Sequence, residues 1–207
     1  MITQNILITL IFCVTTQAFA LIHAPDQYQK ITDSRGRGQS EVAGIINIRE
    51  VIPGVLYRSG KSITNKFGPL SDESLTKLCK QDFSTAFYDY NRGSDHNVPC
   101  GTNQVSLKIR PILNSDKNLH EQLATVYLAI KQGLGPVMSS CDAAHHASGY
   151  VSAAALIQFC GYTNQQALAY WIKNTDGDSN YPKVKAKVLS FRPYGDLQIS
   201  GVKCFKP

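Results

Sequence analysis

A cysteine, two histidines and a serine lie close together in the stretch 136–150, which reads Pro-Val-Met-Ser-Ser-Cys-Asp-Ala-Ala-His-His-Ala-Ser-Gly-Tyr. The short apolar run before Cys141 predicts a strand, and the apolar pattern after Gly149 predicts a helix. A loop between a strand and a helix N-terminus binds anions, because backbone N–H groups converge there and the helix dipole adds positive potential. The same field favours the thiolate form of a cysteine at the mouth of such a loop. These residues therefore predict an anion-binding loop with a reactive thiol.

The stretch from Cys141 to Gly149 resembles the phosphate-binding loop of cysteine-dependent protein phosphatases, the tyrosine and dual-specificity group. That loop reads His-Cys, five residues, Arg, then Ser or Thr, then Gly. The resemblance places Cys141 at the nucleophile, Ser148 at the hydroxyl that assists the leaving thiolate, and Gly149 at the glycine that opens the helix. Well upstream, the segment 57–60 reads Tyr-Arg-Ser-Gly, and several bacterial and plant relatives open the domain with the same four residues.

The loop departs from the family pattern at three positions. Ala147 stands in place of the arginine, Ser140 in place of the preceding histidine, and Ala144 in place of a mid-loop glycine. In the family, the arginine binds two phosphate oxygens through its planar fork and stabilises the charge of the transition state. We expect its loss to slow hydrolysis by roughly 10³-fold or more. Asp142 adds a negative charge that repels both a thiolate and a phosphate.

The resemblance also implies a general acid, and Asp116 stands where the family places it, just before the helix that leads to the loop strand. Arg58 is a candidate substitute for the missing arginine, with Arg110 and Arg192 as more distant candidates. Each residue has an ordinary alternative: Asp116 as a turn residue, the arginines as surface or packing residues, and Cys141 as a buried structural cysteine. The expected ligand-binding residues are Arg58 and the loop backbone at Asp142, Ala143, Ala144, His145, His146, Ala147, Ser148 and Gly149.

The histidine pair is the most distinctive feature of the loop. His145 and His146, with Cys141 and Asp142, are ligand types that zinc or copper accepts. Adjacent histidines seldom face one ion, so we expect two exposed loop histidines, with no metal and no other cofactor. Near neutral pH they would add positive charge to the loop on acidification. The later segment 176–180, Asp-Gly-Asp-Ser-Asn, resembles the start of a calcium loop, but its misplaced glycine favours a turn.

The N-terminus predicts export. Residues 1–20 contain no Asp, Glu, Lys or Arg, and their apolar run ends in Ala-Phe-Ala, a small-x-small cleavage site. We interpret them as a secretory signal peptide, although the usual Lys or Arg near Met1 is absent. The alternative is a buried N-terminal element. No other stretch is apolar enough to cross a bilayer, so we expect no transmembrane segment after cleavage.

The charge of the chain favours anionic partners. The 207 residues are 43% hydrophobic and 17% charged, which fits one well-buried domain, and the net charge is +6. This balance predicts a phosphorylated protein or a small anionic ligand as partner. Because the lysines and arginines are scattered and not interleaved with aromatic residues, we expect no nucleic-acid binding.

The cysteines fit an oxidising compartment. Cys13 falls in the predicted signal peptide, and of the remaining cysteines four can pair while one is left over. Cys141, as the loop thiol, is the natural unpaired one. Four cysteines allow three pairings, between which the sequence does not decide. We favour Cys79–Cys100 and Cys160–Cys204, because each joins a helix to a later loop or tail.

Apolar periodicity predicts alternating strands and helices. Before the loop we expect an extended segment over 45–57, a helix over 71–80 capped by Ser71, a strand over 83–90, a polar loop over 91–104 and a strand over 105–113. A helix from an Asn118–Glu121 capping box to 134 then leads to the strand before Cys141. After the loop we expect a nearly buried helix ending at Gly161, a helix with a capping box of Thr163 and Gln166, and short strands at 188–191 and 197–199. This order predicts an α/β fold with a central, mostly parallel sheet and helices on both faces. The dual-specificity phosphatase fold has the same order of elements.

The predicted organisation is a signal peptide (1–20), a flexible lead-in (21–42), a phosphatase-like domain (43–174) and a C-terminal extension (175–207). We interpret the chain as a secreted or periplasmic pseudophosphatase, catalytically impaired, that binds phosphorylated or other anionic ligands. The first alternative is an active phosphatase, in which Cys141 forms a phosphocysteine, Asp116 protonates the leaving oxygen and another residue supplies the cation. The second is a rhodanese-like or thiol-redox protein, against which the segment 57–60 and the helix pair after the loop argue.

Overall fold

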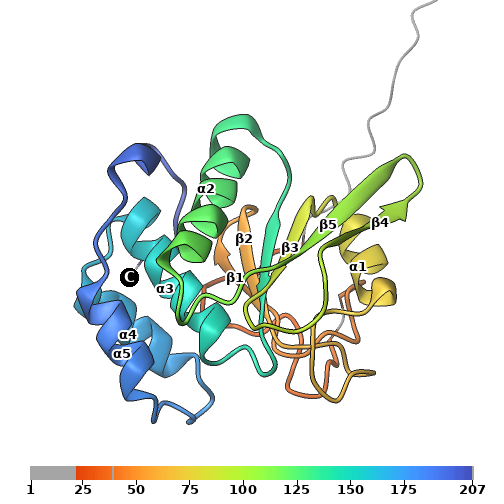
Figure 1. Ribbon diagram of the computed structural model, residues 1–207, viewed down its shortest axis with the longest axis horizontal. Coiled ribbons are helices and arrows are strands. Elements are labelled where there is room, and N and C mark those ends of the chain that lie inside the picture. The colour runs from red at the N-terminus through yellow and green to blue at the C-terminus, as the bar shows by residue number, and fades with distance from the viewer. Residues whose placement is uncertain (1–21, 39, 207) are drawn as a thin grey trace, which may run out of the picture.

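A six-stranded sheet forms the centre of the molecule in the computed structural model, which describes residues 22–38 and 40–206 (Figure 1). Its strands are β1 (Arg49–Ile52), β2 (Leu56–Ser59), β3 (Thr85–Tyr88), β4 (His96–Cys100), β5 (Asn103–Ile109) and β6 (Val137–Ser140). They lie in the order β1-β2-β6-β3-β5-β4. The three central pairs are parallel and the two edge pairs are antiparallel. The predicted central, mostly parallel sheet is confirmed.

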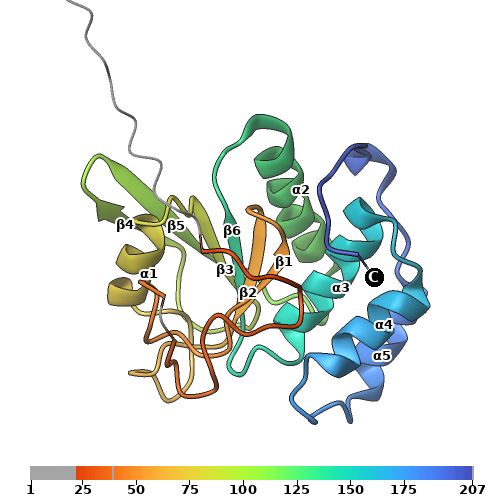
Figure 2. The same cartoon turned by 180° about the vertical axis from the view of Figure 1, so that it is seen from behind.

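Helices cover both faces of this sheet (Figures 1 and 2). They are α1 (Asp72–Cys79), α2 (Asp116–Gln132), α3 (Ala147–Cys160), α4 (Asn164–Lys173) and α5 (Pro182–Ser190), with a 3-10 turn η1 (Gly195–Leu197). Because side chains alternate along a strand, a strand of this sheet contributes residues to two cores, one on each face. Tyr57 packs against Phe83 in the core under α1, whereas its neighbour Leu56 belongs to the core under α2 and α3.

Helix α3 lies at the centre of the larger core, which explains its composition. Every residue from Ala147 to Phe159 is buried, because the helix contacts the sheet and also α2, α4 and α5. A helix surrounded in this way is apolar on all sides. It ends at Gly161, whose φ of 70° is the left-handed conformation typical of a helix C-terminus. The predicted, nearly buried helix is confirmed.

Two of the three predicted helix caps are confirmed. The Ser71 side chain accepts a hydrogen bond from Ser74 N at the start of α1, and Thr163 with Gln166 forms a capping box on α4. The predicted Asn118–Glu121 box is wrong. The α2 cap is Ser115, because the Glu121 carboxylate is held by Arg110 and does not turn back to the helix end.

The polar segment 91–104 contains strand β4, where its composition predicts a loop. Strand β4 pairs with β5 through a turn at Gly101, whose φ is 67°. Of its five residues only Val98 is buried. An edge strand with one exposed face needs few apolar residues, so the pattern that identifies core strands is missing here.

The predicted short strands in the tail are also wrong. Residues 188–190 end helix α5, and Leu197 lies in the 3-10 turn η1. Val184 and Val188 are one helical turn apart and both pack into the core under α3. The tail therefore adds a helix to the domain instead of two strands.

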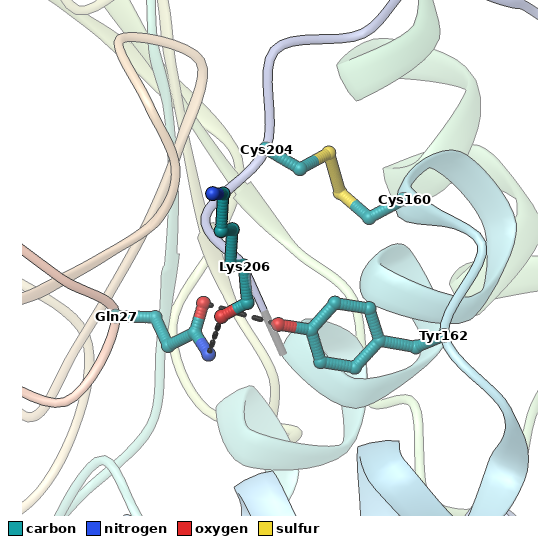
Figure 3. Close-up of a disulfide and its surroundings, with 5 residues drawn as sticks. All are labelled: Gln27, Cys160, Tyr162, Cys204 and Lys206. Atoms are coloured by element: carbon teal, nitrogen blue, oxygen red, sulfur yellow. Dashed lines mark hydrogen bonds between the residues drawn. A yellow bond between two sulfur atoms is a disulfide. The ribbon is translucent and has the colours of Figure 1, made fainter.

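Both favoured disulfides are present. Cys79–Cys100 joins the end of α1 to β4, and Cys160–Cys204 joins the end of α3 to the tail (Figure 3). Beside the second bridge, the Gln27 side chain donates to Lys206 O and accepts from Tyr162 OH. Cys141 is the free cysteine of the described residues, as predicted.

The segment that leads into the first strand packs on the domain. Figure 2 shows it running across the side that faces away from the viewer in Figure 1. Gln27 and Thr32 are buried, and Thr32 Oγ1 donates to Ile45 O. The composition predicts a flexible segment here, whereas these residues pack on the domain. The predicted domain boundary at residue 43 stays a prediction. The predicted signal peptide lies outside the described residues, and among those no helix is long and apolar enough to cross a membrane.

Candidate functional site

The loop between β6 and α3 is anchored by β2. Cys141 follows β6 directly, and its N–H donates to Ser59 O at 3.1 Å. Gly60 forms a bridge with Ala143, and a Cβ on Gly60 would lie 2.5 Å from the Ile46 side chain. The absence of a side chain on Gly60 therefore lets two backbone segments of the protein approach closely. This segment holds the first half of the loop in place.

The loop backbone leaves a run of N–H groups without backbone partners in the described part of the chain. Ala144 has a φ of +65°, the left-handed conformation that the glycine of the resembled loop adopts freely, and alanine there costs about 1 kcal/mol. The N–H groups of residues 142–146 donate to no backbone carbonyl within the described part of the chain. Helix α3 begins without a side-chain cap, so the N–H groups of its first turn are also available. Such a nest binds anions.

The thiol and the hydroxyl that the resemblance singles out lie together. Cys141 Sγ is 3.2 Å from Ser148 Oγ, and both residues are buried. At this distance the serine hydroxyl can donate a hydrogen bond to a thiolate. The roles of Cys141 as nucleophile and of Ser148 as assisting hydroxyl stay predictions. The short distance between the two side chains is compatible with them.

The Asp142 carboxylate is held at the side of the loop. Its Oδ1 accepts from Tyr88 OH at 2.7 Å and from Gly68 N at 3.1 Å. Burial, and then the hydrogen bond to Asp142, raise the pKa of Tyr88. Burial, and then the charges of Cys141 and Asp142, raise the pKa of Tyr90. Neither tyrosine is predicted as a site residue from the sequence, because aromatic residues at a strand end are typical of a core.

Arg58 does not take the place of the missing loop arginine. It is fully buried, and its Nη2 donates to Asn174 O at the end of α4. A Cβ on Gly149 would lie 3.2 Å from Arg58 Nη1 and 2.8 Å from Trp171 Cδ1. Arg58 therefore ties β2 to α3 and α4, and Gly149 is needed for this close packing. At the arginine position of the loop there is only the buried methyl group of Ala147.

Arg110, the candidate arginine that follows β5, forms ion pairs away from the loop. Arg110 binds Glu121 at 2.6 Å and Asp95 at 2.9 Å. Its Nε and Nη1 are bound to these two carboxylates, beside the edge pair of strands β5 and β4 and away from β2.

Asp116 lies beside the first turn of α3. With Tyr150, Lys187 and Arg192 it lines a cavity of about 300 Å³. Its side chain is 82% exposed and its Oδ1 is 3.6 Å from Lys187 Nζ of the tail helix α5. Burial, and then the Asp116 charge, raise the pKa of Tyr150. The general-acid candidate is thus near the helix that the loop opens, and its partner is a lysine of the C-terminal extension.

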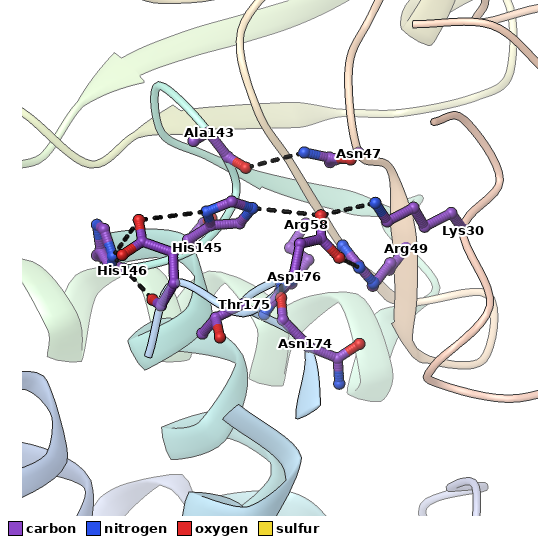
Figure 4. A network of polar contacts seen from close by, with 12 residues as sticks. Lys30, Asn47, Arg49, Arg58, Ala143, His145, His146, Asn174, Thr175 and Asp176 are labelled. Atoms are coloured by element: carbon purple, nitrogen blue, oxygen red, sulfur yellow. Dashed lines mark hydrogen bonds and ion pairs between the residues drawn. The ribbon is translucent and has the colours of Figure 1, made fainter. Parts of the chain in front are cut away.

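The two loop histidines are covered, not exposed as expected (Figure 4). His145 Nε2 is 3.3 Å from Asp176 Oδ2, and His146 Nε2 is 3.2 Å from Asp178 Oδ2. Their side chains are only 14% and 11% exposed, because the turn after α4 packs over them. The His146 ring also stacks on Tyr181, with ring centroids 3.3 Å apart. Among the described residues no group of three or more His, Cys, Asp or Glu is placed to hold a metal ion.

Burial makes these histidines harder to protonate. It lowers the pKa of His145 and of His146, although Asp176 and Asp178 partly oppose the shift. A histidine whose pKa is lower in the folded state takes up its proton more readily when unfolded. We therefore expect His145 and His146 to reduce the free energy of unfolding as the pH falls through about 6.5 and below.

Urea unfolding of the wild type and of His145→Asn between pH 7.5 and 5 checks this expectation. The variant should lose less stability on acidification than the wild type, since asparagine does not titrate. His96, whose pKa is raised, is present in both proteins and cancels in the comparison. Parallel pH profiles would contradict the prediction.

A buried carboxyl group lies under the loop strand. Asp89 follows β3, and it contacts Gln122 Nε2 at 2.6 Å and Ser139 Oγ at 2.8 Å. Burial raises the pKa of Asp89 to about 8, so the folded protein holds it as the neutral acid below that pH. The unfolded chain ionises it above about 4. The contribution of this one group to the free energy of unfolding therefore falls as the pH rises from about 4 to 8, opposite in direction to the contribution of the two histidines.

Asp89→Asn is expected to remove this loss. Relative to the wild type, the variant should gain up to about 1 kcal/mol per pH unit across this range. Chemical unfolding at pH 5, 6.5 and 8 measures the difference. A constant difference at all three pH values would show that Asp89 titrates normally.

A surface hollow lies away from this loop. A cavity of about 660 Å³ opens at the amino ends of β3 and β6, where Phe83, Ser84 and Pro136 line it. In parallel sheets ligands bind at the carboxyl ends of the strands, where Cys141 is. The loop is therefore the better candidate site.

Comparison with solved structures identifies the fold that carries this loop. The crystal structure of DUSP15 matches with a TM-score of 0.51 and 15% identity, over 73% of this chain and 90% of that one. The chain has the dual-specificity phosphatase fold. A variant of TpbA from P. aeruginosa in complex with pTyr matches with a TM-score of 0.49 and 17% identity, over 76% of this chain and 90% of that one. The human tyrosine phosphatase-like serine/threonine/tyrosine-interacting protein matches with a TM-score of 0.48 and 14% identity, over 68% and 92%.

Sequence comparison alone does not identify this fold. No protein-family model matches the chain, and no curated protein sequence matches it. The dual-specificity phosphatase fold is nevertheless the one that the residues of the 141–149 loop and of the 57–60 segment predict.

Proposed function

We propose that this protein binds phosphate-bearing or other small anionic ligands at the 141–149 loop and hydrolyses phosphate esters poorly or not at all. It is, in this proposal, a pseudophosphatase. The observation that carries the proposal is the chemistry at position 147. A buried methyl group stands where the resembled loop has a guanidinium, and Arg58 is fully buried with its Nη2 donating to Asn174 O.

Anion binding is supported by the loop backbone. The N–H groups of 142–146 and of the first turn of α3 offer hydrogen bonds without any side-chain cation. The negative charge of Asp142 opposes this binding, but Tyr88 OH and Gly68 N both donate to its carboxylate. We therefore expect weak anion binding that depends on the backbone N–H dipoles of the loop and of the first turn of α3.

Impaired hydrolysis follows from the electrostatics of the reaction. Phosphoryl transfer depends on fixed positive charge at the equatorial oxygens, and positioned charge is usually the largest single contribution to catalysis. Ala147 supplies none. The side chain of the candidate acid Asp116 is in addition 82% exposed, and its Oδ1 is 3.6 Å from Lys187 Nζ, so no contact in the described residues fixes it over the loop.

Export is part of the proposal. Two disulfides in a chain of this size fit an oxidising compartment, and the composition of residues 1–20 predicts a signal peptide. The free Cys141 is buried, which suits survival of a thiol outside the cytoplasm.

An active phosphatase is the second candidate. The 3.2 Å contact between Cys141 Sγ and Ser148 Oγ favours it, since this is the arrangement that the resemblance implies for a leaving thiolate. A substitute cation would have to come from a residue that moves into the loop. A rhodanese-like or thiol-redox protein has in its favour only the free thiol.

Two measurements on the mature protein test the proposal. Inorganic phosphate and phosphotyrosine should raise its Tm, and no hydrolysis of a generic aryl phosphate should depend on Cys141. Turnover by the wild type that is lost in Cys141→Ser would establish the active-enzyme alternative. An unchanged Tm up to high phosphate concentration would show that the loop binds no anion.

A further inference from the structure

Two buried arginines and a tyrosine lie together behind the loop. Arg49 from β1 is 2% exposed, while Arg58 from β2 and Tyr170 from α4 are fully buried. The Arg58 guanidinium carbon is 5.9 Å from the centre of the Tyr170 ring. Figure 4 shows the Arg49 and Arg58 side chains next to each other around Asp176. We call Arg49, Arg58 and Tyr170 the arginine cluster.

Most hydrogen-bond donors of the arginine cluster have no acceptor. Within residues 22–38 and 40–206, nothing accepts from Nε and Nη1 of Arg49, from Nε and Nη1 of Arg58, or pairs with Tyr170 OH. Only the Nη2 atoms are paired, with Asp176 Oδ1 at 2.8 Å for Arg49 and with Asn174 O for Arg58. Buried polar groups in native proteins are nearly always hydrogen-bonded, so five such donors in one place call for an acceptor.

Charge around the arginine cluster is also unbalanced. Arg49, Arg58 and Lys30 carry three positive charges. Asp176 pairs with Lys30 and Arg49, and no carboxylate of the described residues forms an ion pair with Arg58. Asp176 is already divided among Lys30 at 2.6 Å, Arg49 at 2.8 Å and His145 at 3.3 Å. Buried charges are tolerated when they are paired, and a fully buried guanidinium beside another is not.

We propose that a small inorganic anion of the halide class binds between Arg49, Arg58 and Tyr170. A halide accepts several N–H and O–H donors at once and supplies the missing negative charge. Complete burial of Arg58 and Tyr170 excludes a phosphate ester or a peptide carboxylate from this position. The site is separate from the loop nest, because its donors are side chains from β1, β2 and α4 instead of loop backbone.

Occupancy of this site bears on the loop. Arg58 Nη1 lies against Gly149 in the first turn of α3, and Asp176 links Arg49 to His145 within the loop. A halide that fixes both guanidinium groups therefore also fixes two supports of the loop. This inference does not depend on whether the loop binds phosphate.

The test compares thermal unfolding of the mature protein in sodium bromide and in sodium gluconate at equal ionic strength. Gluconate is too large for an enclosed site. We expect the Tm of the wild type to rise by about 5 °C or more as bromide increases 100-fold from its dissociation constant. Bromide-soaked crystals should show an anomalous peak between the two guanidinium groups.

Matched variants separate the site from general salt effects and from the loop. Tyr170→Phe keeps the ring and removes one donor, and we expect at least 5-fold weaker bromide binding with an unchanged response to phosphate. Arg110→Gln removes an arginine that pairs with Glu121 and Asp95 instead, and it should keep the wild-type response to bromide. Equal Tm responses of wild type and Tyr170→Phe to bromide, or ordered water in place of the anomalous peak, would overturn the proposal.

Discussion

Ala147→Arg is expected to raise kcat/KM for a generic aryl phosphate by about 10³-fold over the wild-type protein. The strand, the nest of N–H groups and the Cys141–Ser148 pair are in place, so the loop lacks chiefly the fork that binds the equatorial oxygens. Position 147 is the first residue of α3, and long side chains on a helix turn back toward its N-terminus, which is the side of the loop. Steady-state hydrolysis by the two proteins at pH 6 to 7 measures the gain.

Three controls make this result interpretable. Cys141→Ser in the Ala147→Arg background should abolish the gain, because the phosphocysteine cannot form. Ala147→Met adds a side chain of similar length without charge and should bring no gain. If Ala147→Arg folds and stays as inactive as Ala147→Met, the loop is not a phosphatase that has lost one charge.

Replacing both Cys160 and Cys204 by serine is expected to lower the free energy of unfolding by about 4 kcal/mol. The bridge spans 44 residues, and closing a loop of this length removes much of the entropy of the unfolded chain. The segment inside it carries α4, α5 and the turn that covers the loop histidines. At two to four degrees per kcal/mol, the Tm should fall by about 10 °C.

The second disulfide provides the matched comparison. Cys79→Ser with Cys100→Ser opens a bridge of separation 21, so its loss should cost slightly less. Thermal and urea unfolding of both double variants under non-reducing conditions give the two values. A Cys160→Ser, Cys204→Ser protein as stable as the wild type would show that the folded contacts of the tail, such as Gln27 with Lys206, already restrain it.

Much of the fold could be predicted from local patterns. Apolar runs and caps identify β3, α1 and α4, and the strand–loop–helix around Cys141 follows from residues adjacent in the chain. These features succeed because hydrogen bonding and side-chain direction in one element depend on its own residues. Where an element is stabilised by a neighbour, as edge strand β4 is by β5, local pattern fails.

The candidate site divides in the same way. Local sequence predicts the loop, its cysteine and serine, its missing arginine and the fold class, of which the structure confirms the fold class. The direction of Arg58 depends on contacts between distant elements: strand alternation and the packing of α4 bring its Nη2 to Asn174 O. The tertiary structure also decided that Asp176 and Asp178 cover the histidines and that Tyr88 holds Asp142. These contacts join residues far apart in the chain, so no local pattern of residues encodes them.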